Sequence, residues 1–314
     1  MTFVEMHALH EAQRGRPRKA QYSDGETDLM RSHMPRLYIV GTPIGNLGDF
    51  SPRGRQCLES CDFIAAEDTR VTAKLLHHFG ISKPMVRYHE HNRKSCGEKI
   101  IARLLAGEAC ALVTDAGMPG ISDPGEDLVA LCHDTGIAVE AVPGPAAFVT
   151  ALAVSGFPSG RFTFEGFLSV NKRSRAEHLR ALANETRTML FYEAPHKLPH
   201  TLRDFALHFG ERPLAIVREL TKIHEEVIRT TCAAAAALYG TEDPDAIHLK
   251  GEIVLVLSGA DAVKEESISL ESAIALAREY AEQGMSQSEA AKRAAMETGR
   301  RRNEIYTGMI EIGG

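Results

Sequence analysis

Tryptophan is absent from the 314-residue sequence, and aromatic side chains make up only 6% of it. Few rings are therefore available for a protein that would bind single-stranded nucleic acid by stacking bases. No apolar run approaches the roughly 18 residues that a membrane span requires, and the first thirty residues lack the apolar stretch of a secretory signal. We expect no contact with a membrane and a cytoplasmic location.

Paired cysteines are also missing. The six cysteines are scattered, and none form the C-x-x-C pairs that are typical of zinc sites and thiol redox sites. Cys57 and Cys61 could share one face of a helix, but a metal there would need two further ligands. We predict reduced thiols and no metal site.

The chain has no excess of positive charge. Its 36 Lys and Arg residues stand against 42 Asp and Glu residues, which leaves a net charge of −6. Diffuse binding along a nucleic acid needs a broadly basic surface, so any contact with RNA has to be local. Hydrophobic residues at 44% and charged residues at 25% are ordinary for a globular protein, and the length allows two cores.

The beginning of the chain differs from the rest. Residues 1–34 show no periodic apolar pattern, which predicts a flexible tail. The tail contains Arg14–Lys19, a string that resembles the core of an AT-hook, although a solvated basic tail is the simpler interpretation.

Residues 35–155 are expected to form an α/β domain. Short apolar runs alternate there with longer amphipathic segments, and this rhythm predicts a parallel sheet. The four runs are Leu37–Val40, Phe63–Ala66, Ala111–Thr114 and Val139–Val142. Loops rich in Gly and Pro follow three of them, at 41–46, 115–120 and 143–146. Because the carboxyl ends of parallel strands share one edge of a sheet, these loops should gather into a ligand site.

A second α/β domain with a mixed sheet is expected over 156–262. Its predicted strands are Phe162–Phe167, Thr188–Tyr192, Leu214–Val217, Glu225–Thr231 and Ile253–Leu257. Residues 268–314 show two helical patterns separated at Gly299, and Ser286 with Glu289 has the spacing of a capping box. This block predicts a small appendage that resembles a helix-turn-helix.

The first loop, Gly41–Asn46, matches neither the dinucleotide-binding pattern nor the P-loop, which disfavours nicotinamide and triphosphate ligands. Longer strings are more specific. They are LYIVGTPIGNL from Leu37, EDTR from Glu67, TDAGMPGISDPG from Thr114, PGPAA from Pro143, FYEAPHK from Phe191 and RELTK from Arg218. With these strings the chain resembles the tetrapyrrole methylase superfamily, and within it the branch that methylates ribosomal RNA.

The resemblance implies two α/β domains that hold S-adenosyl-L-methionine between them, usually in a homodimer. It implies as substrate the 2'-hydroxyl of a cytidine ribose in 16S rRNA, in the decoding region of the small ribosomal subunit. The superfamily's usual Gly-Asp-Pro loop is Gly117-Met118-Pro119 here, which favours the RNA branch over corrin or porphyrin chemistry. Asp115 is the candidate to replace the missing Asp.

The resemblance also assigns residues to the cofactor, although plain packing is the rival interpretation for each one. The residues are Pro43, Ile44, Asp115, Gly117, Ile121, Ser122, Ala146 and Ala147 from the first domain, and Tyr192, Leu220 and Glu252 from the second. A zwitterionic methionine end needs amides and hydroxyls, and an adenine ring needs a flat apolar slot.

Methyl transfer from a sulfonium to a weakly nucleophilic hydroxyl depends on alignment, and a base or a cation near the acceptor helps. The candidates for these catalytic roles are Asp68, Arg70, Glu193 and Lys222. For Asp68 and Arg70 the alternative is the capping of a helix N-terminus. The string His89–Asn92 fits a surface or substrate loop better than a metal site.

Two basic segments are candidates for RNA contacts. Residues 171–180 carry four Lys or Arg residues against one acid, and Arg300–Arg302 forms a second cluster. Two other functions compete with the RNA methyltransferase: methylation of a small macrocycle or a protein, and a ribosome-assembly or DNA-binding protein without catalysis. Neither accounts for the loops and the basic segments together.

Overall fold

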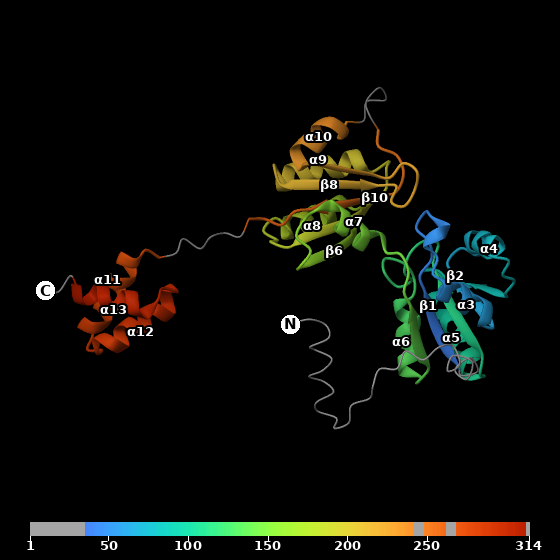
Figure 1. Ribbon diagram of the computed structural model, residues 1–314, viewed down its shortest axis with the longest axis horizontal. Helices are drawn as coiled ribbons and strands as arrows, with labels where there is room; N and C mark the ends of the chain where they lie inside the picture. The colour runs from blue at the N-terminus through green and yellow to red at the C-terminus, as the bar shows by residue number, and fades with distance from the viewer. Residues whose placement is uncertain (1–34, 242–247, 262–267, 312–314) are drawn as a thin grey trace. The chain divides into compact units, whose positions relative to one another are not determined.

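The computed structural model describes residues 35–241, 248–261 and 268–311 of the chain (Figure 1). The predicted N-terminal tail and its basic string therefore lie outside the described residues. The chain divides after Gly259 into a large unit and a small C-terminal unit.

The large unit begins with a parallel sheet in the order β3-β2-β4-β1-β5. Its strands are β1 (Arg36–Val40), β2 (Phe63–Ala66), β3 (Met85–Arg87), β4 (Ala109–Val113) and β5 (Ala138–Val142). The four predicted strands and their parallel pairing are confirmed. The short edge strand β3 was not predicted, because a three-residue run is too short for a periodic signal.

Helices cover both faces of this sheet. They are α3 (Pro52–Ser60), α4 (Thr69–His78), α5 (Arg93–Leu105) and α6 (Glu126–Asp134), with the short 3-10 helix η1 (Leu47–Asp49) after β1. Alternate strand residues face opposite sides, so Phe63 packs with Ile100 of α5 and Leu128 of α6, while Ile64 packs with Leu58 of α3. Both faces are thus buried, as a parallel sheet requires.

The second sheet of the large unit is mixed, with the order β6-β7-β10-β8-β9. Its strands are β6 (Phe162–Phe167), β7 (Thr188–Glu193), β8 (Pro213–Arg218), β9 (Glu226–Thr231) and β10 (Ile253–Leu257). β6 pairs parallel with β7, and the other pairings are antiparallel. All five predicted strands and the mixed sheet are confirmed.

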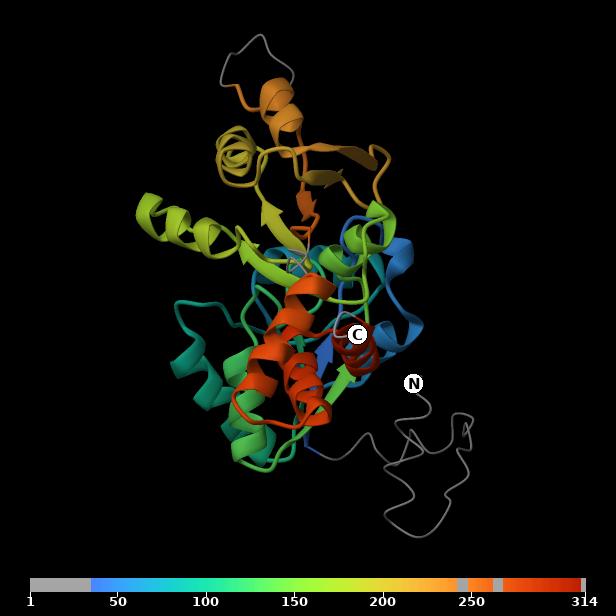
Figure 2. The ribbon, with the colours of Figure 1, turned by 90° about the vertical axis from the view of Figure 1, so that its left-hand side faces the viewer.

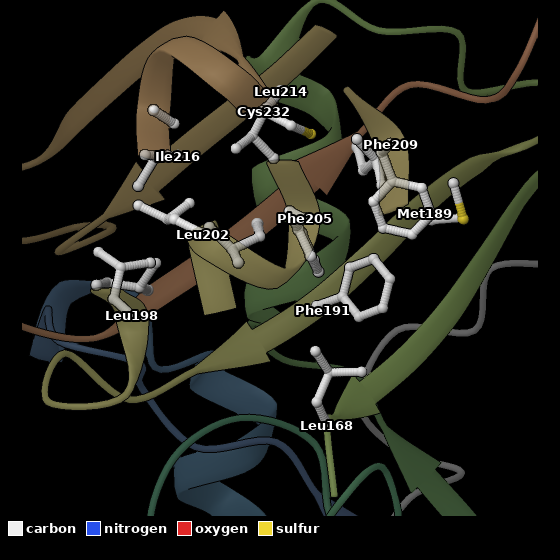
Figure 3. Packing of buried hydrophobic residues seen from close by; sticks show 14 of the residues in the cluster. Leu168, Met189, Phe191, Leu198, Leu202, Phe205, Phe209, Leu214, Ile216 and Cys232 are labelled. Carbon is white, nitrogen blue, oxygen red and sulfur yellow. The ribbon is translucent and has the colours of Figure 1, made fainter. Parts of the chain in front are cut away.

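This sheet also has helices on its two faces. Helix α7 (Ala147–Ser155) covers one face. The other face is covered by α8 (Lys172–Ala181), α9 (Leu198–Phe209) and α10 (Cys232–Tyr239). Phe205 of α9 packs against Phe191 of β7 with ring centroids 5.1 Å apart, in the core shown in Figure 3. On the opposite face, Leu152 of α7 packs with Leu190 and Val254. The predicted domain boundary between residues 155 and 156 falls at the end of α7 and stays a prediction.

The described residues of the small unit form three helices, α11 (Leu270–Glu282), α12 (Gln287–Thr298) and α13 (Arg302–Glu311), drawn in red in Figure 2. The expected number of two helical segments is wrong, because Gly284 (φ 97°) follows α11 and a new helix begins after Ser286. The capping box of Ser286 and Glu289 is confirmed, and Gly299 ends α12 in the left-handed conformation. In the described part of the chain, every helix is too short or too polar to span a membrane.

Candidate functional site

Three loops meet at the carboxyl edge of the parallel sheet. Thr42 and Gly117 exchange backbone hydrogen bonds of 2.9 and 3.1 Å, which joins the loop after β1 to the loop after β4. The loop after β5 comes equally close, because a Cβ on Gly41 would lie 2.6 Å from Gly144 Cα. Only glycine permits this approach. The loops therefore form one continuous wall, as their positions in the sequence predicted.

The loop after β1 also reaches the second half of the large unit. A Cβ on Gly45 would lie 2.7 Å from Lys222 Cγ, so this glycine lies directly against the turn between β8 and β9. Between the loops of the first half and the strands of the second half lies a cavity of about 410 Å³. This volume is in the range of small-molecule and cofactor sites.

Ten of the eleven predicted cofactor residues line this cavity. They are Ile44, Asp115, Gly117, Ile121, Ser122, Ala146, Ala147, Tyr192, Leu220 and Glu252. Pro43, the eleventh, is next to Ile44 but does not line the cavity. The sequence motifs and the folded chain thus converge on one place, while the contact that each residue makes with a ligand stays a prediction.

The cavity combines an apolar wall with an acidic one. Val217, Leu220 and Val254 form part of the apolar wall, and Glu67, Asp115 and Asp123 contribute three carboxyl groups. None of these carboxyl groups forms an ion pair with another described residue.

The acidic residues influence one another. Burial raises the pKa of Glu67, Asp115 and Asp123, and the charges of neighbouring carboxylates raise them further. For Asp123 the pKa rises to about 7, chiefly through burial and then through the charges of Glu67 and Asp115. A cation that entered the cavity would relieve this repulsion. The site is therefore suited to a positively charged ligand with an apolar portion.

Residues in the left-handed backbone conformation occur on both sides of the cavity. They are Ser122 (φ 65°) in the first half, and Glu219 (φ 52°) and Thr221 (φ 67°) around Leu220 in the second. This conformation is costly for residues other than glycine and is frequent at functional sites. The Glu219 carboxylate is held by Lys222 Nζ at 2.9 Å and by the backbone N–H of Glu252 at 3.0 Å.

The predicted catalytic residues Asp68 and Arg70 do not line the cavity. Asp68 caps α4 by accepting a hydrogen bond from the backbone N–H of Arg70 at 2.9 Å, and it accepts another from Arg70 Nε at 3.0 Å. These hydrogen bonds hold the pKa of the Asp68 carboxyl well below its usual range. Their contacts are those of a helix cap, which was the alternative interpretation of these two residues. They are linked to the cavity through Asp115: the backbone N–H of Asp68 donates to Asp115 Oδ1 at 3.1 Å, and the charge of Arg70 lowers the pKa of Asp115 against the larger effect of burial.

Lys222, the third predicted catalytic residue, also lies behind the cavity wall. Its ammonium group donates to the carboxylates of Glu219 at 2.9 Å and Glu252 at 3.3 Å. Two anionic partners raise its pKa against the effect of burial, so it remains charged. The observed contacts position the turn that carries Leu220.

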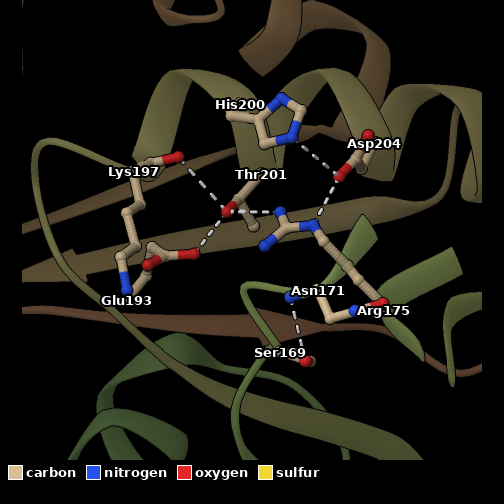
Figure 4. Close-up of polar contacts among 8 residues, drawn as sticks. All are labelled: Ser169, Asn171, Arg175, Glu193, Lys197, His200, Thr201 and Asp204. Atoms are coloured by element: carbon tan, nitrogen blue, oxygen red, sulfur yellow. Dashed lines mark hydrogen bonds and ion pairs between the residues drawn. The ribbon is translucent and has the colours of Figure 1, made fainter. Parts of the chain in front are cut away.

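Glu193, the fourth, lines the cavity at the end of β7, but its side chain is buried and engaged elsewhere. Its carboxylate accepts a hydrogen bond from the backbone N–H of Ala194 and another from the Thr201 hydroxyl, and the second is drawn in Figure 4. Thr201 Oγ1 in turn accepts a hydrogen bond from Arg175 Nη2 at 2.8 Å. These contacts tie β7 to α8 and α9. Arg175 belongs to the basic segment 171–180 that was expected to contact RNA. For this residue the expectation is wrong, because its side chain lies on the buried face of α8.

Two kinds of cavity residue were not predicted from the sequence. Asp123 lies within the string that carried the family resemblance, where it could have been recognised as a carboxyl group next to Ser122. Phe148 and Phe167 gave no such signal, because their place in the wall depends on how strands and helices pack.

The histidine loop lies at the N-terminus of α5. Asn92 accepts a hydrogen bond from the backbone N–H of His89 at 2.9 Å and donates one to the carbonyl of Arg87 at 2.8 Å, which closes the turn. The rings of His89 and His91 have centroids 5.9 Å apart. Within the residues that the structure describes, no group of three His, Cys, Asp or Glu side chains could hold a metal ion.

Comparison with known proteins gives three concordant findings. The family of Tetrapyrrole (Corrin/Porphyrin) Methylases matches residues 36–236. Ribosomal RNA small subunit methyltransferase I of Synechocystis sp. is 46% identical over 277 residues, covering 88% of this chain and 98% of the relative. The protein of the same name from Xylella fastidiosa (strain Temecula1) is 46% identical over 274 residues, covering 87% of this chain and 98% of the relative.

Solved structures agree on the fold. A cobalt precorrin-4 methyltransferase superposes with a TM-score of 0.52 at 17% identity, covering 72% of this chain and 95% of that one. The uroporphyrin-III C-methyltransferase of Thermus thermophilus, complexed with S-adenosylhomocysteine, superposes with a TM-score of 0.50 at 16% identity, covering 71% and 97%. At these identities the likeness shows the fold alone.

Proposed function

This chain belongs to the ribosomal RNA small subunit methyltransferase I family of the tetrapyrrole methylases, and on that premise we propose that it methylates the 2'-hydroxyl of a cytidine ribose in 16S rRNA. Its cofactor is S-adenosyl-L-methionine, and its reaction is the methylation of ribosomal RNA. The cytidine, the ribose oxygen and the place of the nucleotide in the decoding region are the proposed part.

The observation that carries the proposal is the combination, in one cavity, of an apolar wall with carboxyl groups that form no ion pair with a described residue. S-adenosyl-L-methionine has an adenine ring, a sulfonium cation and a zwitterionic amino-acid end with an α-ammonium and an α-carboxylate group. Val217, Leu220 and Val254 suit the ring, and Asp115 and Glu67 suit the cationic portion. The small side chains of Ala146 and Ala147 leave room against the backbone. The described residues therefore fit this cofactor.

The bound cofactor supplies an electrophilic methyl carbon on a good thioether leaving group. The protein has to align the acceptor oxygen with that carbon, exclude water and accept one proton. We assign the proton to the Asp123 carboxylate, since the described residues give it no hydrogen-bond or ion-pair partner, whereas Asp115 and Glu67 each accept a backbone N–H and three further acids have side-chain partners. Asp68 is paired with Arg70, Glu193 with Thr201 and Glu252 with Lys222. When the acceptor hydroxyl is methylated, its proton would pass to the Asp123 carboxylate.

A pKa near 7 suits Asp123 for this role. A general base works best when its pKa is close to the working pH, because it is then ionised and still basic enough to take a proton. Burial among Glu67 and Asp115 produces that value. Asp115 and Glu67 stay next to it as electrostatic partners, and each accepts one backbone N–H, from Asp68 and Asp115 respectively.

The proposal extends to assembly and location. We propose that the chain acts as a homodimer, as the sequence resemblance implies, and that it works in the cytoplasm where small ribosomal subunits are made. Sedimentation velocity of the purified protein tests the first part. A species with the mass of two chains is expected, and a monomer at micromolar concentration contradicts it.

The test of the function uses small subunits from cells that lack this protein, the purified chain and cofactor labelled in the methyl group. Digestion of the RNA to nucleosides should give the label in 2'-O-methylcytidine alone. Because a 2'-O-methyl group blocks alkaline cleavage at its own phosphodiester, the labelled position should also resist alkali. Label in a base-methylated nucleoside, or in protein, would contradict the proposal.

A further inference from the structure

Phe167 is an apolar side chain that the fold leaves uncovered at the cavity. It lies at the end of β6 and lines the cavity, yet 59% of its surface is exposed. Removing a phenylalanine ring from water is favourable, so an exposed ring at a binding site indicates a contact with a ligand that binds there.

A β-bulge directs Phe167 into the cavity. The register of β6 against β7 shifts between Phe164 and Gly166, so Phe167 pairs with Tyr192. Without the shift, Gly166 would lie opposite Tyr192 and Phe167 would face the other side of the sheet. Gly166 has a φ of 62°, which a residue with a side chain adopts only with strain. The glycine therefore places the aromatic ring.

The ring ends a row of aromatic side chains. The centroids of Phe148 and Phe164 are 4.4 Å apart, those of Phe164 and Tyr192 are 5.0 Å apart, and those of Tyr192 and Phe167 are 5.5 Å apart. In a chain with 6% aromatic residues this is a marked concentration. The inner rings are at least half buried, and they support Phe167 from one side while its other side stays open.

The neighbours of the bulge connect it to both the acidic wall and the basic helix. A Cβ on Gly166 would lie 3.6 Å from Ser122 Oγ, in the loop that also carries Asp123. The carboxylate of Glu165, on the other side of the bulge, forms a hydrogen bond of 2.8 Å with the ring of His178 in α8. The two residues before Phe167 thus contact the loop that carries Asp123 and helix α8.

We propose that Phe167 stacks on the nucleobase of the acceptor nucleotide, an inference that rests on the proposed function. The 2'-hydroxyl is attached next to the carbon that carries the base. A ribose that reaches Asp123 therefore brings its base to the rim of the cavity. Bases taken out of a folded RNA are commonly held by aromatic rings. The cofactor's adenine is the other flat ring available, but it suits the enclosed apolar wall better than a half-exposed rim.

The experiment compares Phe167→Ala, Phe167→Tyr and the matched control Phe162→Ala. Phe162 lies on the same strand and is 38% exposed, but it does not line the cavity. For each variant, KM for small subunits, kcat and the Kd of S-adenosylhomocysteine are measured. We expect Phe167→Ala to raise KM for the subunit about tenfold, which is the order of one base stack, and to leave the Kd for S-adenosylhomocysteine within about twofold. Phe167→Tyr should restore KM, and Phe162→Ala should change neither quantity.

Two results would overturn the inference. Weaker S-adenosylhomocysteine binding in Phe167→Ala with KM for the subunit unchanged would assign the ring to the cofactor. Unchanged values for both would leave the ring without a ligand contact. Methylation of the subunit by the unmodified chain is the separate test of the proposed function, and its failure would remove the inference as well.

Discussion

The buried Arg175 and the partly buried Asp204 form an ion pair in which Arg175 Nε donates to the Asp204 carboxylate at 2.5 Å. The pair joins α8 to α9, and the second arm of the guanidinium continues through Thr201 to Glu193 at the cavity (Figure 4). In the sequence Arg175 belongs to a basic segment, but in the structure it stabilises the second half of the large unit.

Replacing Arg175 should therefore weaken the fold. Arg175→Met leaves the carboxylate of Asp204 without its main partner, and because that side chain is 24% exposed we expect a loss of about 3 kcal/mol, at the lower end for a buried pair. Arg173→Met is the matched control, since Arg173 is 87% exposed and pairs only with Glu177, a contact worth about 0.5 kcal/mol. Urea unfolding measures the stability of both variants. Equal destabilisation in the two would show that the buried pair has no special weight.

Ala146 offers a test of the cofactor site. Ala146→Trp would place an indole in the cavity beside Gly117 and Ala147 without touching the sheet cores. We expect the affinity for S-adenosylhomocysteine to fall at least about tenfold by calorimetry, with a thermal midpoint within a few degrees of the unmodified chain. A variant that folds and binds as before would show that Ala146 faces away from the ligand.

The pKa of Asp123, near 7, predicts the pH dependence of the reaction. The base has to be ionised, so kcat/KM should rise about tenfold per pH unit below about pH 7 and level off above it. Asp123→Asn should abolish this rise and lower kcat at about pH 8 by a factor of about 10²–10⁴. A rate profile of the unmodified chain that stays flat from mildly acidic to mildly alkaline pH would exclude Asp123 as the base.

The same carboxyl group should affect stability. Its pKa in the folded chain lies above its ordinary value of 3.8, so ionisation opposes folding, and stability falls as the pH rises from about 4 to about 7. Asp123→Asn should therefore melt higher than the unmodified chain at about pH 8 and equally at about pH 3.5. Asp68→Asn is the opposite control, because Arg70 lowers the pKa of Asp68 and its charge stabilises the fold. Shifts of the same sign in mildly alkaline buffer would contradict this reasoning.

The exposed cations of α8 provide a test of the RNA surface. Lys172, Arg173 and Arg180 are exposed, whereas Arg175 is not. Reversing the three exposed charges should weaken binding to the small subunit. The slope of log K against log salt should fall by about one for each phosphate group that the variant no longer binds. The Kd for S-adenosylhomocysteine should stay the same. If RNA binding is unaffected, α8 is only a solvated face.

Part of the site was predictable because its signals are local. Short apolar runs such as Leu37–Val40, separated by amphipathic segments, predict buried strands. Glycines such as Gly41 mark where the chain leaves the sheet. The capping box at Ser286 is likewise contained in four residues. The small unit was harder, since the break between α11 and α12 depends on Gly284, whose effect on a helix is weaker than that of the flanking apolar pattern.

Other roles depended on partners far along the chain. Asp68 follows a strand and points to the correct edge of the sheet, but whether it faces a ligand or Arg70 depends on side-chain geometry. Arg175 looks like its exposed neighbours in the sequence, although it is four residues before the buried Leu179 on the inner face of α8.

The amino-acid sequence by itself determined the order of strands and helices, the three loops of the parallel sheet and the family, because these depend on short patterns of burial and turn chemistry. The tertiary structure alone decided which carboxyl groups are free in the cavity and which are paired. It also decided that Phe167 faces inward, since one bulge at Gly166 reverses the direction of every later side chain in the strand. Such features depend on contacts between residues that are distant in sequence, and no local pattern records them.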